Sequence, residues 1–126
     1  MKLNINCVRD VLLQCENIPF NGSYSFSQLT SLLPNYTDDE IAYTCLKLHE
    51  GNYLHIVTKN YGSNVCVVRI NDISFQGHEF LNNIRSNKVW NDVLAVGDKI
   101  GTSSINGFVQ IATGVVTALI KSQLGI

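Results

Sequence analysis

Hydrophobic residues recur at helical spacing over most of the chain. Between residues 5 and 16 the apolar positions fall at i, i+3, i+4 and i+7, and they are Val8, Val11, Leu12 and Cys15. This spacing predicts an amphipathic helix with one apolar face. The same periodicity predicts further helices over residues 26–33, 37–50, 75–85, 89–100 and 105–124.

Two of the predicted helices begin with a pair of polar residues at capping-box spacing. Ser25 with Gln28, and Thr37 with Glu40, place a hydroxyl and a carboxyl or amide where they can satisfy free backbone N–H groups. Pro34 cannot continue the first of these helices. That helix is expected to bury its four large apolar residues, which are Phe26, Leu29, Leu32 and Leu33.

A β-hairpin is expected between the third and fourth helices. Large or branched side chains alternate along the first strand at Leu54, Ile56 and Thr58. Residues 65–70 are apolar and rich in β-branched side chains, and the polar residues 59–64 between the two runs favour a turn. Helices flanking such a hairpin are typical of a winged helix-turn-helix domain.

Two glycines at the ends of this hairpin are expected to have structural roles. Gly51 is expected to adopt the left-handed conformation that ends a helix. Gly77 lies inside the helix that Ser74 can cap, where glycine costs about 1 kcal/mol relative to alanine. Close packing of that helix against the hairpin explains why a glycine is present.

The predicted fold class is mainly α with a small β-hairpin (α+β), in the form of a winged helix-turn-helix with a C-terminal helical extension. Residues 1–126 are expected to form a single domain. Residues 1–85 would form the winged-helix core, and residues 86–126 would form C-terminal helices available for dimerisation. The hydrophobic content of 45% is sufficient for a core of this size.

Charge gives no general support for nucleic-acid binding. The formal net charge is −1, and the basic residues are scattered along the sequence. The 37–50 helix, which would read DNA in a helix-turn-helix, carries four acidic residues and only Lys47, a net charge of −3. Phosphates would be repelled by that helix, whereas its first-turn carboxylates complement the helix dipole.

The hairpin, in contrast, favours nucleic-acid binding, because it carries cations without acidic neighbours. No Asp or Glu lies between Gly51 and Asn71. A wing of this kind can approach the sugar-phosphate backbone or enter a minor groove. An ordinary solvated hairpin would explain the same residues. The candidate contacts to double-stranded DNA are Lys47, Lys59, Asn60, Tyr61 and Arg69.

No catalytic, cofactor or metal site is predicted, and the protein is not expected to be an enzyme. His78–Glu79 resembles the start of a zinc-protease motif, but the position four residues after His78 is Asn82. The four cysteines form no C-x-x-C pair. No signal peptide is expected ahead of them. We therefore expect free thiols in the reducing cytoplasm.

Residues 77–90 have the sequence GHEFLNNIRSNKVW. This string resembles the hallmark of domain-of-unknown-function family 2513, a group of uncharacterised bacterial and phage proteins similar to the YjcQ-like winged-helix proteins. Residues 1–13 and 39–51 resemble the same family. Residues 73–77 also resemble the entry to the helix after the wing in MarR-type repressors. The resemblance implies a winged-helix fold and a phage-related context, and it implies no catalytic residue.

The last predicted helix is nearly uncharged, with Lys121 as its charged residue. Its apolar surface would be covered either by its own domain or by a second chain. Its apolar length falls short of the roughly 20 residues that a membrane span needs, so no membrane span is expected. The candidate homodimer contacts are Phe108, Ile111, Val115 and Leu119.

Two functions remain open at this point. The first is a phage-type transcriptional regulator that binds DNA as a homodimer. The second is a protein–protein interaction module that keeps the winged-helix scaffold without affinity for DNA. The acidic start of the 37–50 helix favours the second, and the fold and family resemblance favour the first.

Overall fold

The computed structural model describes all residues from 1 to 126. The chain forms two compact units, Met1–His78 and Glu79–Ile126. The boundary falls inside helix α4 (Phe75–Ile84), so this helix contributes residues to both units. The single domain, and its division between residues 85 and 86, stay predictions.

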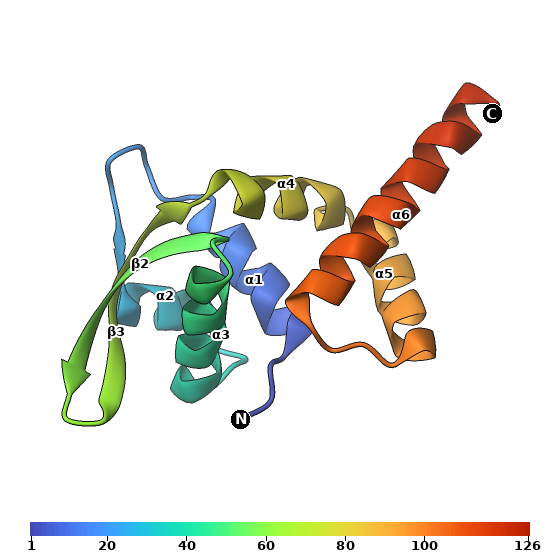
Figure 1. Ribbon diagram of the computed structural model, residues 1–126. Coiled ribbons are helices and arrows are strands. Elements are labelled where there is room, and N and C mark those ends of the chain that lie inside the picture. The colour runs from blue at the N-terminus through green and yellow to red at the C-terminus, as the bar shows by residue number, and fades with distance from the viewer. The chain divides into compact units, whose positions relative to one another are not determined.

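The first unit combines helices with a small antiparallel sheet (Figure 1). Its elements, in chain order, are α1 (Ile5–Cys15), β1 (Tyr24–Ser25), α2 (Phe26–Leu32), α3 (Asp38–Glu50), β2 (Leu54–Tyr61), β3 (Asn64–Ile73) and the start of α4. The strand order is β1-β3-β2. The α+β fold class, with mainly helical structure and a small hairpin, is confirmed.

Capping interactions fix where these helices begin. At α2, the Gln28 backbone N–H donates to Ser25 Oγ over 3.1 Å, and the Ser25 N–H donates to Gln28 Oε1 over 2.8 Å. At α3, Thr37 and Glu40 exchange the equivalent pair of bonds, each 3.1 Å long. Both predicted capping boxes are confirmed. Each satisfies backbone N–H groups that the first helical turn leaves unpaired.

The end of α3 differs from the prediction. Gly51 has a φ of −82°, so it does not adopt the left-handed conformation. The left-handed residue is the next one, Asn52, with a φ of 66°. Asparagine tolerates this region better than most residues because its short polar side chain can hydrogen-bond locally. The glycine prediction was wrong because it placed the reversal one residue too early.

The hairpin is longer and its turn tighter than predicted. Tyr61 pairs with Asn64, so the turn consists of Gly62 and Ser63 alone, and Gly62 has a φ of 63°. The predicted turn of residues 59–64 therefore lies mostly within the strands. The register shifts between His55 and Ile56 and again between Val57 and Thr58. These irregularities are β-bulges, which place extra residues on β3.

Strand β1 was not predicted from the sequence. Tyr24 pairs with Ile70 and Ser25 with Arg69, which makes β3 the central strand at this level. The apolar side chains of α1, α3 and the inner face of the hairpin are buried in this unit. Leu29 and Leu33 are buried as expected, whereas Leu32 is 43% exposed, so its predicted burial was wrong. Phe26 is only half-buried.

Gly77 closely approaches the residue that leads into β2. An ideal Cβ at this position would clash with the Tyr53 backbone oxygen and would lie 2.5 Å from Ile73 Cγ2. Ser74 caps the helix, because the Gly77 N–H donates to Ser74 Oγ over 3.1 Å. The close packing predicted for Gly77 is confirmed.

The second unit contains the end of α4, α5 (Asn87–Ile100) and α6 (Ile105–Leu124). Ser86 caps α5 and Ser104 caps α6 through bonds of 3.1 and 2.9 Å to backbone N–H groups. The turn between the two helices passes through Gly101, whose φ of 72° is left-handed. Trp90 on α5 and Phe108 on α6 lie 6.3 Å apart between ring centroids.

Helix α6 is 20 residues long and has a mean hydropathy of 1.2, so it is long and apolar enough to cross a membrane by length and composition alone. The predicted shortfall in apolar length was therefore wrong. One such helix is weak support for a span, because a core helix of a soluble protein passes the same test. No stronger sign of a membrane protein accompanies it.

Candidate functional site

The outer face of the β2–β3 hairpin gathers three of the residues selected from the sequence. Val57, Lys59 and Tyr61 alternate along β2 and therefore share one face. Val57 pairs with Arg69, so Arg69 lies on that face as well. We call the surface formed by Lys59, Tyr61 and Arg69 the hairpin face. Lys59 Nζ lies 5.1 Å from the centroid of the Tyr61 ring, within reach of a cation–π contact.

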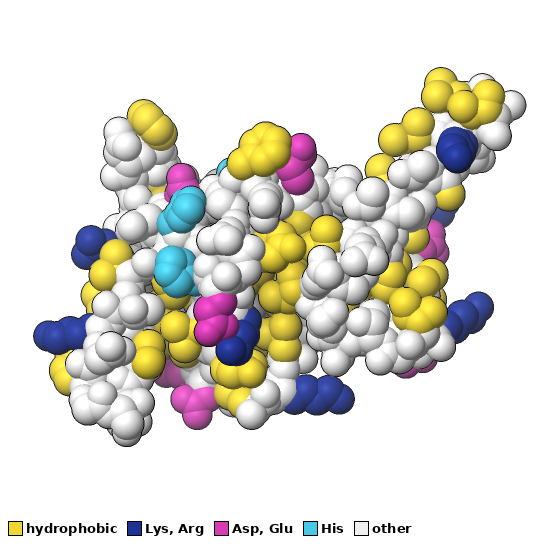
Figure 2. All heavy atoms as spheres, viewed as in Figure 1, with side chains coloured by type: hydrophobic (Ala, Val, Ile, Leu, Met, Phe, Trp, Pro, Cys, Tyr) yellow, Lys and Arg dark blue, Asp and Glu magenta, His cyan; other side chains and the backbone are white.

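The two cations of the hairpin face are not neutralised by carboxylates. Arg69 donates from Nε to Asn71 Oδ1 over 3.3 Å, which engages a neutral partner. The sequence between Gly51 and Asn71 contains no Asp or Glu. Figure 2 shows dark-blue Lys and Arg side chains on the outer part of the hairpin without magenta carboxylates between them. The hairpin face is therefore locally positive, although the chain as a whole is not.

Asn60 and Lys47 do not join this surface. Asn60 pairs with Val65 and points to the opposite side of the ribbon from Lys59 and Tyr61. Lys47 lies on α3, where its Nζ is 2.8 Å from Glu50 Oε2. The hydrogen bond to Glu50 raises the pKa of Lys47 above its usual value. The local positive charge of Lys47 is thus largely balanced by a carboxylate.

One of the three carboxylates at the start of α3, that of Glu40, has a structural role. Glu40 accepts the Thr37 backbone N–H, and its Oε2 accepts from Asn4 Nδ2 over 3.3 Å. The Thr37 bond, followed by the Asn4 bond, lowers the pKa of Glu40. Asp38 and Asp39 are exposed beside it. The α3 N-terminus therefore presents negative charge to any partner.

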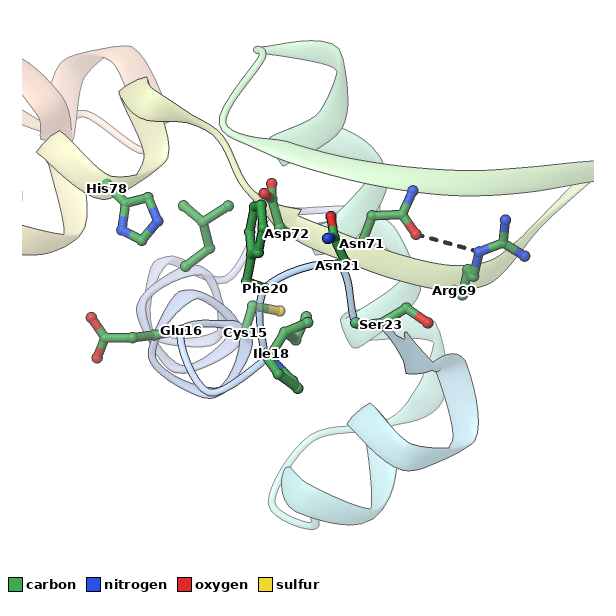
Figure 3. A pocket seen from close by; sticks show the side chains of 13 residues that line it. Cys15, Glu16, Ile18, Phe20, Asn21, Ser23, Arg69, Asn71, Asp72 and His78 are labelled. Atoms are coloured by element: carbon green, nitrogen blue, oxygen red, sulfur yellow. Dashed lines mark hydrogen bonds between the residues drawn. The ribbon is translucent and has the colours of Figure 1, made fainter.

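A second surface feature is an open pocket of about 630 Å³ in the first unit. It lies between the loop after α1 and the end of β3, and the side chain of His78 on α4 closes one end (Figure 3). We call it the loop groove. Its polar and charged lining includes Glu16, Arg69, Asn71 and Asp72. No local sequence pattern predicts this groove, because the loop meets β3 only in the folded chain.

One known protein family matches most of the length of the chain. The family profile described as “Hypothetical protein (DUF2513)” matches residues 2–103. The chain belongs to this family. The match extends from α1 through α5 and ends before α6. No curated protein and no solved structure matches the chain.

Three of the four thiols of this DUF2513 chain are buried. They are Cys7, Cys15 and Cys45, and all four cysteines are free. Burial raises the pKa of all three, that of Cys15 to about 12. Cys66 is exposed on β3. No group of three or more His, Cys, Asp or Glu residues in the chain could hold a metal ion.

The residues selected on α6 differ in their exposure. Phe108 is buried, with only 4% of its surface exposed, and its ring packs against Gly97 and Trp90. Ile111, Val115 and Leu119 are half-buried. Phe108 thus belongs to the interior of the second unit and offers little surface to another chain.

An apolar groove runs along the C-terminal half of α6. It has a volume of about 340 Å³. Its apolar lining residues are Val89, Val116, Leu119, Ile120 and Leu124. Figure 2 shows hydrophobic side chains along this half of α6. Ile120 and Leu124, at 53% and 67% exposed, are the most accessible large apolar residues of the groove.

Proposed function

We propose that this protein is a non-enzymatic regulator that binds double-stranded DNA through the hairpin face. The observation that carries the proposal is the placement of Lys59 and Arg69 on one face beside Tyr61, within a hairpin stretch that contains no Asp or Glu between Gly51 and Asn71. Cations in such an arrangement can replace the counterions of two phosphates. The phage-related context rests on the family resemblance, and a cytoplasmic location is supported by the free thiols.

The order of elements supports a winged helix-turn-helix for the first unit. Three helices precede the hairpin, and the short strand β1 between α1 and α2 pairs with β3. In this arrangement the hairpin is the wing and α3 is the recognition helix. Because α3 begins with exposed Asp38 and Asp39, we assign the phosphate contacts to the wing and not to α3.

A homodimer is part of the proposal because two cations make few phosphate contacts. The apolar groove on α6 supports self-association, since a surface of this kind is normally covered. Ile111, Val115 and Leu119 stay candidate contacts, and exposed Ile120 and Leu124 extend the surface. Two chains would bring two hairpin faces, and therefore four cations, to one duplex.

DNA binding is tested by fluorescence anisotropy with a random 20-base-pair duplex at low ionic strength. The variant Lys59→Gln with Arg69→Gln should bind at least about tenfold more weakly, because two phosphate contacts are lost. The control, Lys2→Gln with Lys88→Gln, removes two exposed cations elsewhere and should bind like the unaltered chain. Equal losses in both variants would contradict an interface on the hairpin.

Self-association is tested by sedimentation velocity. Ile120→Asp with Leu124→Asp should convert a dimer to a soluble monomer, because each carboxylate would be buried at the contact. Val96→Asp with Ile100→Asp changes two exposed apolar residues of α5 and should leave the dimer intact. A monomeric unaltered chain at about 100 µM, a concentration well above the Kd of a stable dimer, would contradict this part of the proposal.

A second candidate function is a protein-interaction module without DNA affinity. The Lys47–Glu50 ion pair and the exposed carboxylates at the start of α3 favour it, because they leave the expected recognition helix without an available cation. This alternative predicts no duplex binding even at low salt. The anisotropy titration therefore separates the two functions directly.

A further inference from the structure

The loop groove is lined by both a positive and a negative side chain, and a β-bulge brings them together. His55 and Val57 lie two residues apart on β2 and share a face, and they pair with Asp72 and Arg69. Asp72 and Arg69 are three residues apart, which in a regular strand would place them on opposite faces. The extra residue, Asn71, brings them to the same side. A carboxylate and a guanidinium therefore both line the groove.

The charged ends of the groove are available to a ligand. Arg69 uses Nε for its bond to Asn71, which leaves its two terminal nitrogens to donate elsewhere. The side chains of Asp72 and His78 form no ion pair or hydrogen bond, and both residues are exposed. In Figure 3, His78 and Arg69 lie at opposite ends of the pocket, with Asp72 between them.

The loop after α1 forms another wall of the groove and carries an exposed aromatic side chain. Phe20 is 95% exposed and lines the groove. The loop is tightly turned, since the Gly22 N–H donates to the Pro19 oxygen over 2.7 Å and Asn21 adopts a left-handed φ of 63°. An exposed phenylalanine held on a compact turn gives an apolar contact to a ligand at little cost in ordering.

We propose that the loop groove binds a short zwitterionic peptide, with its carboxylate at Arg69 and its ammonium group at Asp72. The lining carries Glu16, Asp72 and one Arg, a net charge of −1 with His78 neutral, which disfavours an anion such as a nucleotide. Because the bulge leaves Asp72 and Arg69 opposite residues only two apart on β2, their backbone positions are about 7 Å apart along the strand. The backbone of an extended tripeptide, about 10 Å long, covers this distance, whereas a single amino acid carries both charges on one residue.

The inference does not rest on DNA binding, although Arg69 belongs to both surfaces. The probes are the tripeptide leucyl-alanyl-phenylalanine, the same peptide acetylated and amidated at its ends, and free phenylalanine. Each is titrated into the isotope-labelled full chain and followed by amide chemical shifts. The free tripeptide should shift residues 16–23, 69–73 and 78, and it should bind about 5- to 20-fold more tightly than either other probe, because each lost end removes a charge-assisted hydrogen bond.

Two single variants distinguish this site from the DNA interface. Asp72→Asn should weaken tripeptide binding about 5- to 20-fold and leave duplex affinity unchanged or higher, because it removes a carboxylate. Lys59→Gln should weaken duplex binding and leave tripeptide binding unchanged. The proposal is overturned if the tripeptide shifts no groove residue at about 10 mM, the range of very weak binding. It is equally overturned if the capped peptide binds as well as the free one, or if Asp72→Asn has no effect.

Discussion

Replacing Gly77 with alanine should destabilise the protein, although the same change usually stabilises a helix. Alanine is favoured over glycine by about 1 kcal/mol in a helix interior. Here the new methyl group would overlap the Tyr53 backbone oxygen and approach Ile73 Cγ2 to 2.5 Å. The Tyr53 oxygen accepts the Ser74 N–H over 3.2 Å, so moving it would weaken that bond as well.

The net effect can be worked out from these opposing terms. Overpacking costs about 1–3 kcal/mol, and a weakened backbone hydrogen bond costs about 1 kcal/mol. After the helix-propensity gain is subtracted, the free energy of unfolding should fall by about 1–3 kcal/mol. Urea unfolding followed by circular dichroism measures this change from the shift in midpoint.

Gly114 on α6 provides the matched control. No atom lies within 4 Å of the position where its Cβ would be, so Gly114→Ala should stabilise the chain by up to about 1 kcal/mol. Opposite signs for the two substitutions would support the close approach of α4 to the start of β2. A Gly77→Ala chain as stable as the unaltered one would refute that packing.

Three further predictions concern the two units. The pKa of Glu40 is lowered from its ordinary value of 4.5, so ionised Glu40 stabilises the fold at pH values above 4.5, and this stability is lost as the pH falls through the lower folded-state pKa. The variant Glu40→Gln should lack this pH-dependent component in acid unfolding. An unchanged pH profile of stability would contradict it. Trp90→Ala should cost about 3–5 kcal/mol because the indole is 96% buried against its surroundings; a loss below about 1 kcal/mol, typical of surface sites, would argue against a packed second unit. In thiol titration of the native chain, Cys66 should react rapidly and Cys15, with a pKa of about 12, slowly; equal rates would contradict the burial.

Elements with local signals could be predicted from the sequence. The capping boxes at Ser25 and Thr37 use side chains only three residues apart, so both helix starts were correct. Strand β1 could not be found in this way, because two residues carry no periodicity and Tyr24 becomes a strand only by pairing with Ile70. The exposure of Leu32 likewise depends on how α2 packs, which helical spacing does not determine.

The candidate site was predictable in part for the same reason. The cations of the hairpin and their lack of acidic neighbours are visible in the sequence, and alternation alone places Lys59 and Tyr61 together. Arg69 joins them through the pairing register. The Lys47–Glu50 bond has a recognisable helical spacing, but whether it forms depends on side-chain conformation. The loop groove depends on a bulge at Asn71 and a distant loop, which no local pattern specifies.

The salt dependence of duplex affinity tests the central claim most directly. If the hairpin face supplies two phosphate contacts per chain, a plot of log affinity against log salt should have a slope of about −1.8 for one chain and −3.6 for a dimer. Lys59→Gln with Arg69→Gln should bring the slope close to zero. Undetectable binding at the lowest salt, or a slope that the double variant leaves unchanged, would contradict DNA binding through the hairpin.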